Sequence, residues 1–178
     1  LLRLAYHAPQ VAHPDFMSLV VVDALLSGGK AMFAFGDSPA RSARLYRALV
    51  ETGLASSAGS NFHPSRDPYL LSLGATVRDG RQPDEVERAM LAEVTALQQE
   101  LVPTSELAVA IRQTQAQFAY SAESVTGQAL TLGFLDIVDR HRRLDGVFDE
   151  LAAVTPGDVQ RAAYTYLGED NRTLGWFL

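Results

Sequence analysis

The sequence of 178 residues contains no cysteine, which excludes disulfide bonds and thiolate metal sites but leaves the cellular compartment open. No apolar run approaches the ~18 residues that a membrane-spanning helix needs. A basic surface is also missing, since the formal net charge is −6 and the pI is about 5.1. The one basic cluster is typical of a solvated helix end: Arg140, Arg142 and Arg143. We therefore expect neither nucleic acid nor membrane as a partner.

What is present fits a single folded domain spanning residues 1–178. The composition is 47% hydrophobic and 20% charged, as in soluble globular proteins, and the length allows one sizeable core. The chain begins LLRLAYHAP, without an initiator Met or the basic region of a signal peptide, and inside an apparent strand. We expect it to be part of a longer, soluble polypeptide, cytoplasmic or periplasmic.

Hydrophobic periodicity predicts strands and helices in a mixed order. Strands are expected over residues 1–8, 55–62, 69–77 and 172–178, and helices over 15–27, 42–52, 83–101, 104–140, 144–154 and 155–167. Residues 30–40 are rich in small residues and predict a loop. Thr104 is expected to cap the longest helix, with a bend at Gly127 or Gly133. This order predicts an α+β fold, with a largely antiparallel sheet covered by helices on one face.

The last predicted helix has the clearest local signature. Thr155 is a suitable N-cap, Pro156 suits the first helical position, and Asp158 can return a hydrogen bond to the cap. Gly168 then ends the helix before the final strand.

The chain lacks the histidine spacing of a catalytic zinc site. The zinc peptidase motif H-x-x-E-H places two histidines four residues apart on one helix. Of the four histidines, no two have this spacing: His7, His13, His63 and His141. Each is more typical of a surface or strand-end residue, so we expect no metal site within this chain.

Motifs of other enzyme classes are missing too. There is no G-x-S-x-G nucleophile elbow, and the sequence around Gly28, Gly29 and Lys30 lacks the glycine spacing of a phosphate-binding loop. Three glutamates of one predicted helix are typical of its solvated face: Glu85, Glu87 and Glu93. An enzyme of an unrelated class, with a pocket that the sequence does not reveal, remains an alternative.

Four stretches in order resemble one protein family. They are DALLSGG with RSARLYRALVETGLASSAG, LLSLGATVRDG-x-x-PDEVERAMLAEVTAL, QAQFAYSAESVTGQALTLG, and TPGDVQRAA-x-x-YL-x-x-x-NRT. Together they are similar to the insulinase/pitrilysin-type zinc peptidases, which include mitochondrial processing peptidase. The resemblance covers nearly the whole chain and points to the C-terminal, non-catalytic domain. It implies an α+β domain of the LuxS/processing-peptidase type.

In this family the non-catalytic domain often supplies an arginine and a tyrosine that face the zinc site. Alignment on the family motif puts Val50 in the place of the arginine and Ser56 in that of the tyrosine, so neither role carries over. Nearby polar residues are the remaining candidates for contact with a substrate chamber. The candidate set is Arg44, Tyr46, Arg47 and Ser56.

The resemblance implies a chain without a cofactor of its own. Its expected partners are a zinc-bearing homologous domain, in the same or another chain, and a peptide substrate enclosed between the two. Residues 28–40 are expected to be mobile at that interface. A homodimer or heterodimer is left open. The alternative is a catalytically inactive assembly protein, like the core subunits of respiratory complexes.

Overall fold

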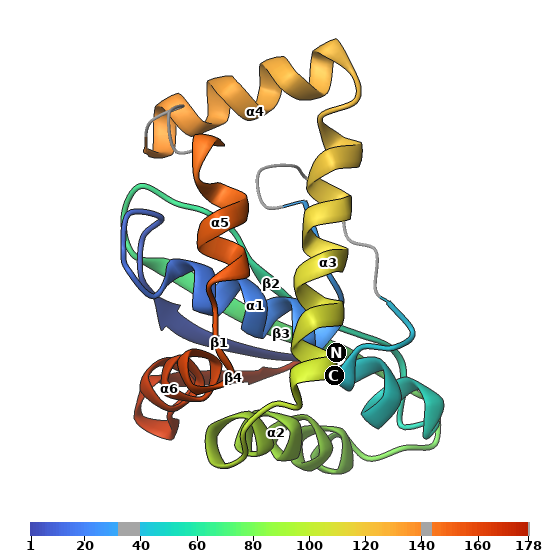
Figure 1. Ribbon diagram of the computed structural model, residues 1–178. Coiled ribbons are helices and arrows are strands. Elements are labelled where there is room, and N and C mark those ends of the chain that lie inside the picture. The colour runs from blue at the N-terminus through green and yellow to red at the C-terminus, as the bar shows by residue number, and fades with distance from the viewer. Residues whose placement is uncertain (32–39, 140–143, 178) are drawn as a thin grey trace.

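The computed structural model describes residues 1–31, 40–139 and 144–177, and its centre is a four-stranded sheet (Figure 1). The strands are β1 (Leu2–Ala8), β2 (Ala55–Phe62), β3 (Tyr69–Val77) and β4 (Arg172–Trp176), in the spatial order β2-β3-β1-β4. All three pairings are antiparallel. The α+β class and the antiparallel sheet expected from the sequence are confirmed.

The helices follow the predicted order. They are α1 (Phe16–Ser27), the π-helix η1 (Tyr46–Glu51), α2 (Pro83–Gln99), α3 (Thr104–Ser121), α4 (Val125–Val138), α5 (Val147–Ala152), α6 (Pro156–Tyr166) and the short 3₁₀ helix η3 (Glu169–Asn171). Across the part of the chain with described structure, no helix is long and apolar enough to cross a membrane. The predicted loop at 30–40 and the arginine cluster at 140–143 lie largely or wholly outside the described residues.

The prediction of one long helix over residues 104–140 is wrong, because the structure has two helices there, α3 and α4. The chain turns sharply between α3 and α4, and Ser124 caps the new helix by accepting a hydrogen bond from the Gly127 N–H at 2.9 Å. Gly127 does not bend a continuous helix. It allows the sharp turn between α3 and α4, because a Cβ at this position would lie 1.9 Å from the Ser121 carbonyl oxygen. At the other end Pro103, not Thr104, is the N-cap residue of α3.

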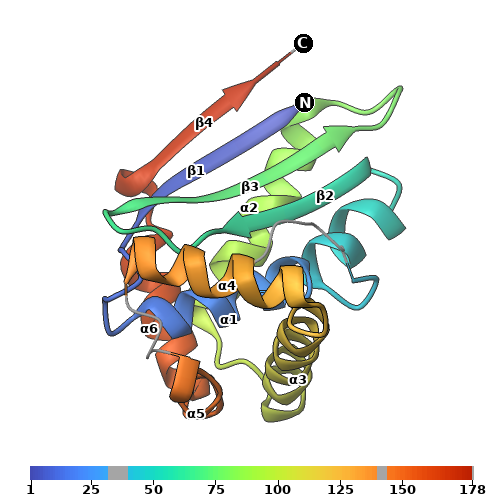
Figure 2. The same cartoon turned by 90° about the horizontal axis from the view of Figure 1, so that it is seen from above.

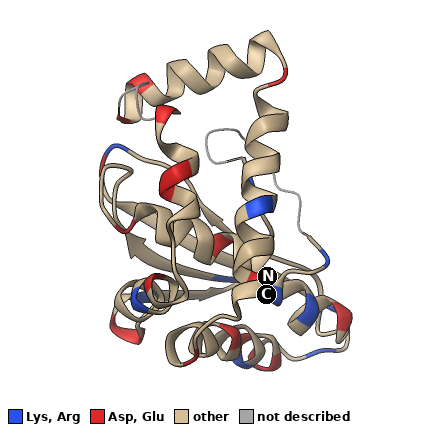
Figure 3. Ribbon diagram, in the orientation of Figure 1, with Lys and Arg blue, Asp and Glu red and all other residues tan. Residues whose placement is uncertain are grey.

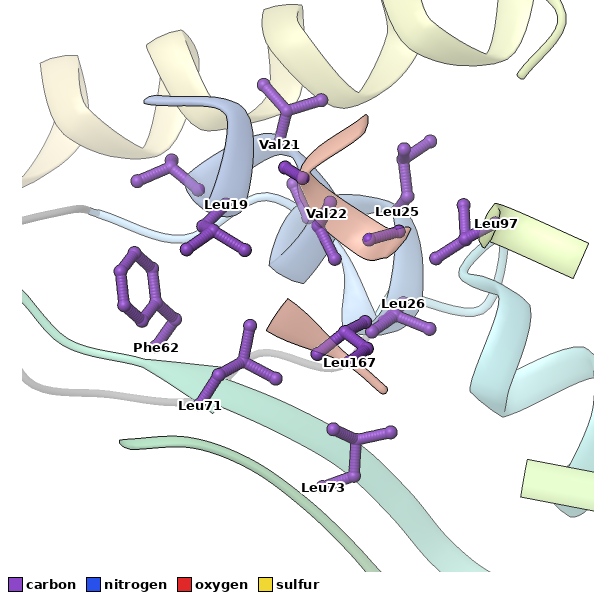
Figure 4. Close-up of a cluster of buried hydrophobic side chains, with 14 of the residues drawn as sticks. Leu19, Val21, Val22, Leu25, Leu26, Phe62, Leu71, Leu73, Leu97 and Leu167 are labelled. Carbon is purple, nitrogen blue, oxygen red and sulfur yellow. The ribbon is translucent and has the colours of Figure 1, made fainter. Parts of the chain in front are cut away.

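Helix α1 forms the middle of the core. Every residue from Phe16 to Ser27 is buried, as expected for a helix that is apolar on all sides. Figure 4 shows Leu19, Val22 and Leu26 of α1 on the side of Leu71 and Leu73 of β3, with Leu167 between them and Leu97 to one side. The buried helix therefore holds the sheet and the outer helices together.

The opposite face of the sheet is left open by the helices (Figure 2). Along β1, Leu2, Leu4 and Tyr6 are buried while Arg3 and His7 are exposed. This alternation is typical of a sheet that packs on its core with one face only. The prediction of helices on one face is confirmed.

The C-terminal helix has the predicted cap. Thr155 Oγ1 accepts from the Asp158 N–H at 3.2 Å, and the Asp158 carboxylate accepts from the Thr155 N–H at 3.1 Å. This is the reciprocal arrangement of a capping box, with Pro156 in the first turn.

Candidate functional site

The predicted chamber residues Arg44 and Arg47 meet at one carboxylate. The guanidinium of Arg44 donates two parallel hydrogen bonds to Glu106 of α3, with Nε–Oε1 at 2.8 Å and Nη2–Oε2 at 2.7 Å. Arg47 Nη2 lies 3.6 Å from Glu106 Oε1. A two-pronged arginine–carboxylate pair of this kind is strong and geometrically specific. It fastens the segment before η1 to the start of α3.

A second acid lies near this pair. Burial raises the pKa of the Glu93 carboxyl on α2, the nearby Arg44 and Arg47 lower it, and Glu106 raises it again, with a net increase. The cluster thus contains two arginines, Arg44 and Arg47, and two glutamates, Glu93 and Glu106. The side chain of Arg44 is 12% exposed and already paired with Glu106, whereas that of Arg47 is 54% exposed.

The other two predicted residues are placed separately. Tyr46 begins η1 and is half-buried. Ser56 is exposed near the start of β2, at the register irregularity between Ala55 and Ser57, and its hydroxyl donates to the Thr76 carbonyl at 3.3 Å. The structure therefore joins Arg44 and Arg47 through Glu106. Whether any of the four contacts a substrate stays a prediction.

The structure reveals a buried polar cluster that sequence reasoning missed. Lys30 Nζ lies 2.9 Å and 3.1 Å from the two carboxylate oxygens of Asp23, which sits inside the apolar helix α1. Ser60 of β2 donates its hydroxyl to the same carboxylate, and its carbonyl accepts from Lys30. The side chains of Lys30 and Asp23 are only 15% and 6% exposed. The sequence held one sign of this cluster: Asp23 is the single charged residue in the segment Phe16–Ser27, which is otherwise mostly apolar.

A further carboxylate joins the two ends of the chain. Asp15, just before α1, accepts from Arg161 Nη1 at 2.6 Å and from the Tyr166 hydroxyl at 2.9 Å. Burial raises the pKa of Asp15, but the hydrogen bonds from Arg161 and Tyr166 lower it by more, so the net pKa lies below the ordinary 3.8. Burial and the bond to Asp15 raise the pKa of Tyr166 to about 12.

A lowered pKa predicts a specific pH dependence for Asp15. Because the folded pKa is below the unfolded one, this carboxylate stabilises the protein above pH ~4, and the contribution is lost as the pH falls through the folded pKa. Asp15→Asn should cost about 1.5–3 kcal/mol at pH 7 and clearly less at pH 3. Urea unfolding at both values tests this.

The matched control for Asp15 is Glu169→Gln. Glu169 is 86% exposed and lies 3.4 Å from Arg172, so its loss should change the free energy of unfolding by at most ~0.5 kcal/mol. An Asp15→Asn penalty that is equal at pH 7 and pH 3 would contradict the assigned role.

The three described histidines lie in different segments of the chain. The ring of His13 accepts from the Asp15 N–H through Nδ1 at 3.1 Å, whereas His7 lies on β1 and His63 follows β2. His141 is outside the described residues. Over residues 1–31, 40–139 and 144–177, no group of three His, Asp or Glu side chains could hold a metal ion.

Comparison with known proteins gives a consistent result. A family model described as the peptidase M16 inactive domain matches residues 1–114. No curated protein matches the chain significantly. A protein from Bordetella pertussis Tohama I, provisionally described as a zinc protease, is similar with 26% identity and a TM-score of 0.81, over 99% of this chain and 92% of that one.

Two larger proteins share the fold. A protease from Helicobacter pylori matches with 20% identity and a TM-score of 0.84, over 97% of this chain but only 40% of its own. A chain of complex III₂ from Candida albicans matches with 16% identity and a TM-score of 0.77, over 97% of this chain and 41% of its own. This chain thus spans about two fifths of either protein. The family model matches residues 1–114, which is more than half of this chain, and this shows that the chain belongs to the peptidase M16 family, as an inactive domain.

Proposed function

We propose that the chain is the non-catalytic half of an insulinase-like zinc peptidase. It would close a proteolytic chamber over peptides that are cleaved at a zinc site on a homologous domain. The observation that carries the proposal is the family match, which is to the inactive domain of the peptidase family. The similarity to the Bordetella pertussis protein over 99% of this chain supports it.

A division of labour between domains is consistent with the lengths of the similar proteins. The chain corresponds to 40% of the Helicobacter pylori protease, which leaves room in that protein for other domains. In this proposal zinc and the water-activating glutamate belong to such a domain, in the same or another polypeptide. This chain would contribute shape, enclosure and contacts to the bound peptide.

Of the predicted chamber residues, Arg47 and Ser56 are the more available for substrate. Arg47 is 54% exposed, and Ser56 is exposed at the edge strand β2. Arg44 has a different role in the proposal, because its two bonds to Glu106 hold the segment before η1 against the start of α3. It positions the segment that carries Arg47.

The second candidate is an assembly protein without peptidase activity. The similarity to a chain of complex III₂ favours it, as does the closed Arg44–Glu106 pair, which leaves Arg44 little capacity for a substrate. The two candidates differ in whether the complete protein turns over peptides.

Deletion of this domain tests the chamber role. We expect the complete protein to cleave an unstructured peptide, and a version without residues 1–178 to keep its zinc but lose cleavage. Unchanged cleavage after the deletion would contradict the proposal. Absence of both zinc and cleavage in the complete protein would favour the assembly role.

A further inference from the structure

The sheet differs in charge from the rest of the molecule. The chain carries 21 acidic residues, but none lies in any of the four strands, whereas β1 and β4 each contain an arginine. In Figure 3 the strands are almost entirely tan, and the red acidic positions lie on helices and loops. The strands that form the open face thus carry no carboxylate that would repel an anion.

One row across this sheet has almost no side chains. Gly175 of β4 and Gly74 of β3 are the two register partners of Arg3 on β1, and Gly59 of β2 is the register partner of Gly74. Residues directly opposite one another share a face of the sheet. Arg3 extends over Gly74, since a Cβ on that glycine would lie 2.7 Å from Arg3 Nη1 and 3.2 Å from Arg3 Cδ.

The row opens into a pocket of about 270 Å³, which extends over β3 and β2 to the end of α1. Its lining contains two cationic side chains, Arg3 and Lys30, together with hydroxyls and the Asn61 amide, and no Asp or Glu. Lys30 is neutralised by Asp23. Among the described residues, Arg3 is exposed and has no ion pair, and the side chains of Asn61 and Ser72 have no hydrogen-bond partner.

We infer that this pocket binds a carboxylate of an extended peptide, with Arg3 as its charged anchor. Ser72 and Asn61 are register partners on the same face, one step along the strands from Arg3 and Gly74. A guanidinium, an amide and a hydroxyl therefore present their donors on one side. Planar, two-oxygen anions are the groups that a guanidinium fork recognises best. The identification of the ligand as a peptide rests on the proposed function.

The size of the pocket limits what it can hold. Sites for small molecules and cofactors usually measure ~300–1,000 Å³. A pocket of about 270 Å³ is just below that range and open to solvent on the bare sheet face, so it suits one or two residues of a longer chain. The carboxylate comes either from a glutamate or aspartate side chain or from the peptide's C-terminus.

Binding by the complete protein tests the inference, with a chelator present so that no peptide is cleaved. Three fluorescently labelled, unstructured peptides are compared by anisotropy: one with a glutamate and an amidated C-terminus, one with glutamine instead, and the glutamine peptide with a free C-terminus. Arg3→Gln should weaken binding of a carboxylate-bearing peptide at least about tenfold, as loss of a charge-assisted pair implies, and leave the neutral peptide unchanged.

Two further variants make the result specific. Arg172→Gln removes the same charge from the same sheet, but Arg172 pairs with Glu169, so it should leave binding unaltered. Asn61→Leu should weaken the same peptides as Arg3→Gln. Comparison of the glutamate peptide with the free C-terminus peptide shows whether the pocket prefers a side-chain carboxylate or a C-terminal one. Equal binding of all three peptides, or equal effects of Arg3→Gln and Arg172→Gln, would overturn the inference.

The test is independent of cleavage. Arg3-dependent binding in a protein that cleaves nothing would support the pocket and remove the chamber role. If cleavage depends neither on the peptide's carboxylate nor on Arg3, and binding does not either, the chamber role stands and the carboxylate pocket is refuted.

Discussion

Lys30→Met is expected to lower the free energy of unfolding by about 3–5 kcal/mol, because it leaves a buried carboxylate without its cation. Asp23 is 6% exposed, and Lys30 is the cation that lies within 3.1 Å of both of its oxygens. Removing one partner of a buried pair costs much more than removing both. Urea-induced unfolding of the two proteins measures the loss.

The double variant Lys30→Met/Asp23→Asn is the matched comparison. It removes the charge that Lys30 had compensated and leaves the amide able to accept from Ser60, whose hydroxyl contacts Asp23 Oδ1. We expect it to regain at least half of the stability lost in Lys30→Met. A double variant as unstable as the sum of the two single ones would show that the groups act independently.

Leu71→Ala should cost about 2–5 kcal/mol, the range for truncating a fully buried leucine. Leu71 is 0% exposed on β3, one of the two inner strands, and its side chain points toward Phe62 and Leu19 in Figure 4. The lost contacts cannot be replaced by water, and the rigid sheet limits collapse around the cavity. The unfolding midpoint in urea and the thermal midpoint should both fall.

The control for Leu71 is Leu130→Ala on α4. Leu130 is 64% exposed, and alanine is a good helix former, so the free energy of unfolding should change by less than ~0.5 kcal/mol. A loss at Leu130 comparable to that at Leu71 would show that α4 is packed against something in the protein under test.

Strand β3 was predictable because apolar side chains alternate along it. Residues 55–62 and 69–77 match β2 and β3 at both ends, and Leu71, Leu73 and Ala75 on one face are all buried. The last helix was predictable because Thr155 and Asp158 form a local cap. In both cases the signal lies within a few residues of the structure it determines.

The errors have non-local causes. The helical pattern over residues 104–140 predicted one helix with a bend at Gly127 or Gly133, whereas the chain breaks into α3 and α4 just before Gly127, which packs against the Ser121 carbonyl. The helix expected over 42–52 is a π-helix from Tyr46 to Glu51. Hydrophobic spacing does not distinguish this from an α-helix over so short a length.

The same limit applies to the candidate site. Arg44 and Arg47 could be chosen from the sequence as neighbours on one segment, but Glu106, the acid that binds both, lies in a different helix. Asp23 and Lys30 are seven positions apart and looked unrelated. Pairs that depend on how helices pack are visible only in the folded chain.

The most direct test of the central claim is the zinc content and peptidase activity of the complete protein beside those of residues 1–178 alone. The account predicts one zinc per complete protein and cleavage of unstructured peptides, with neither property in the isolated chain. If the complete protein binds no zinc, the fold serves assembly instead. Stoichiometric zinc bound by residues 1–178 alone would contradict the account.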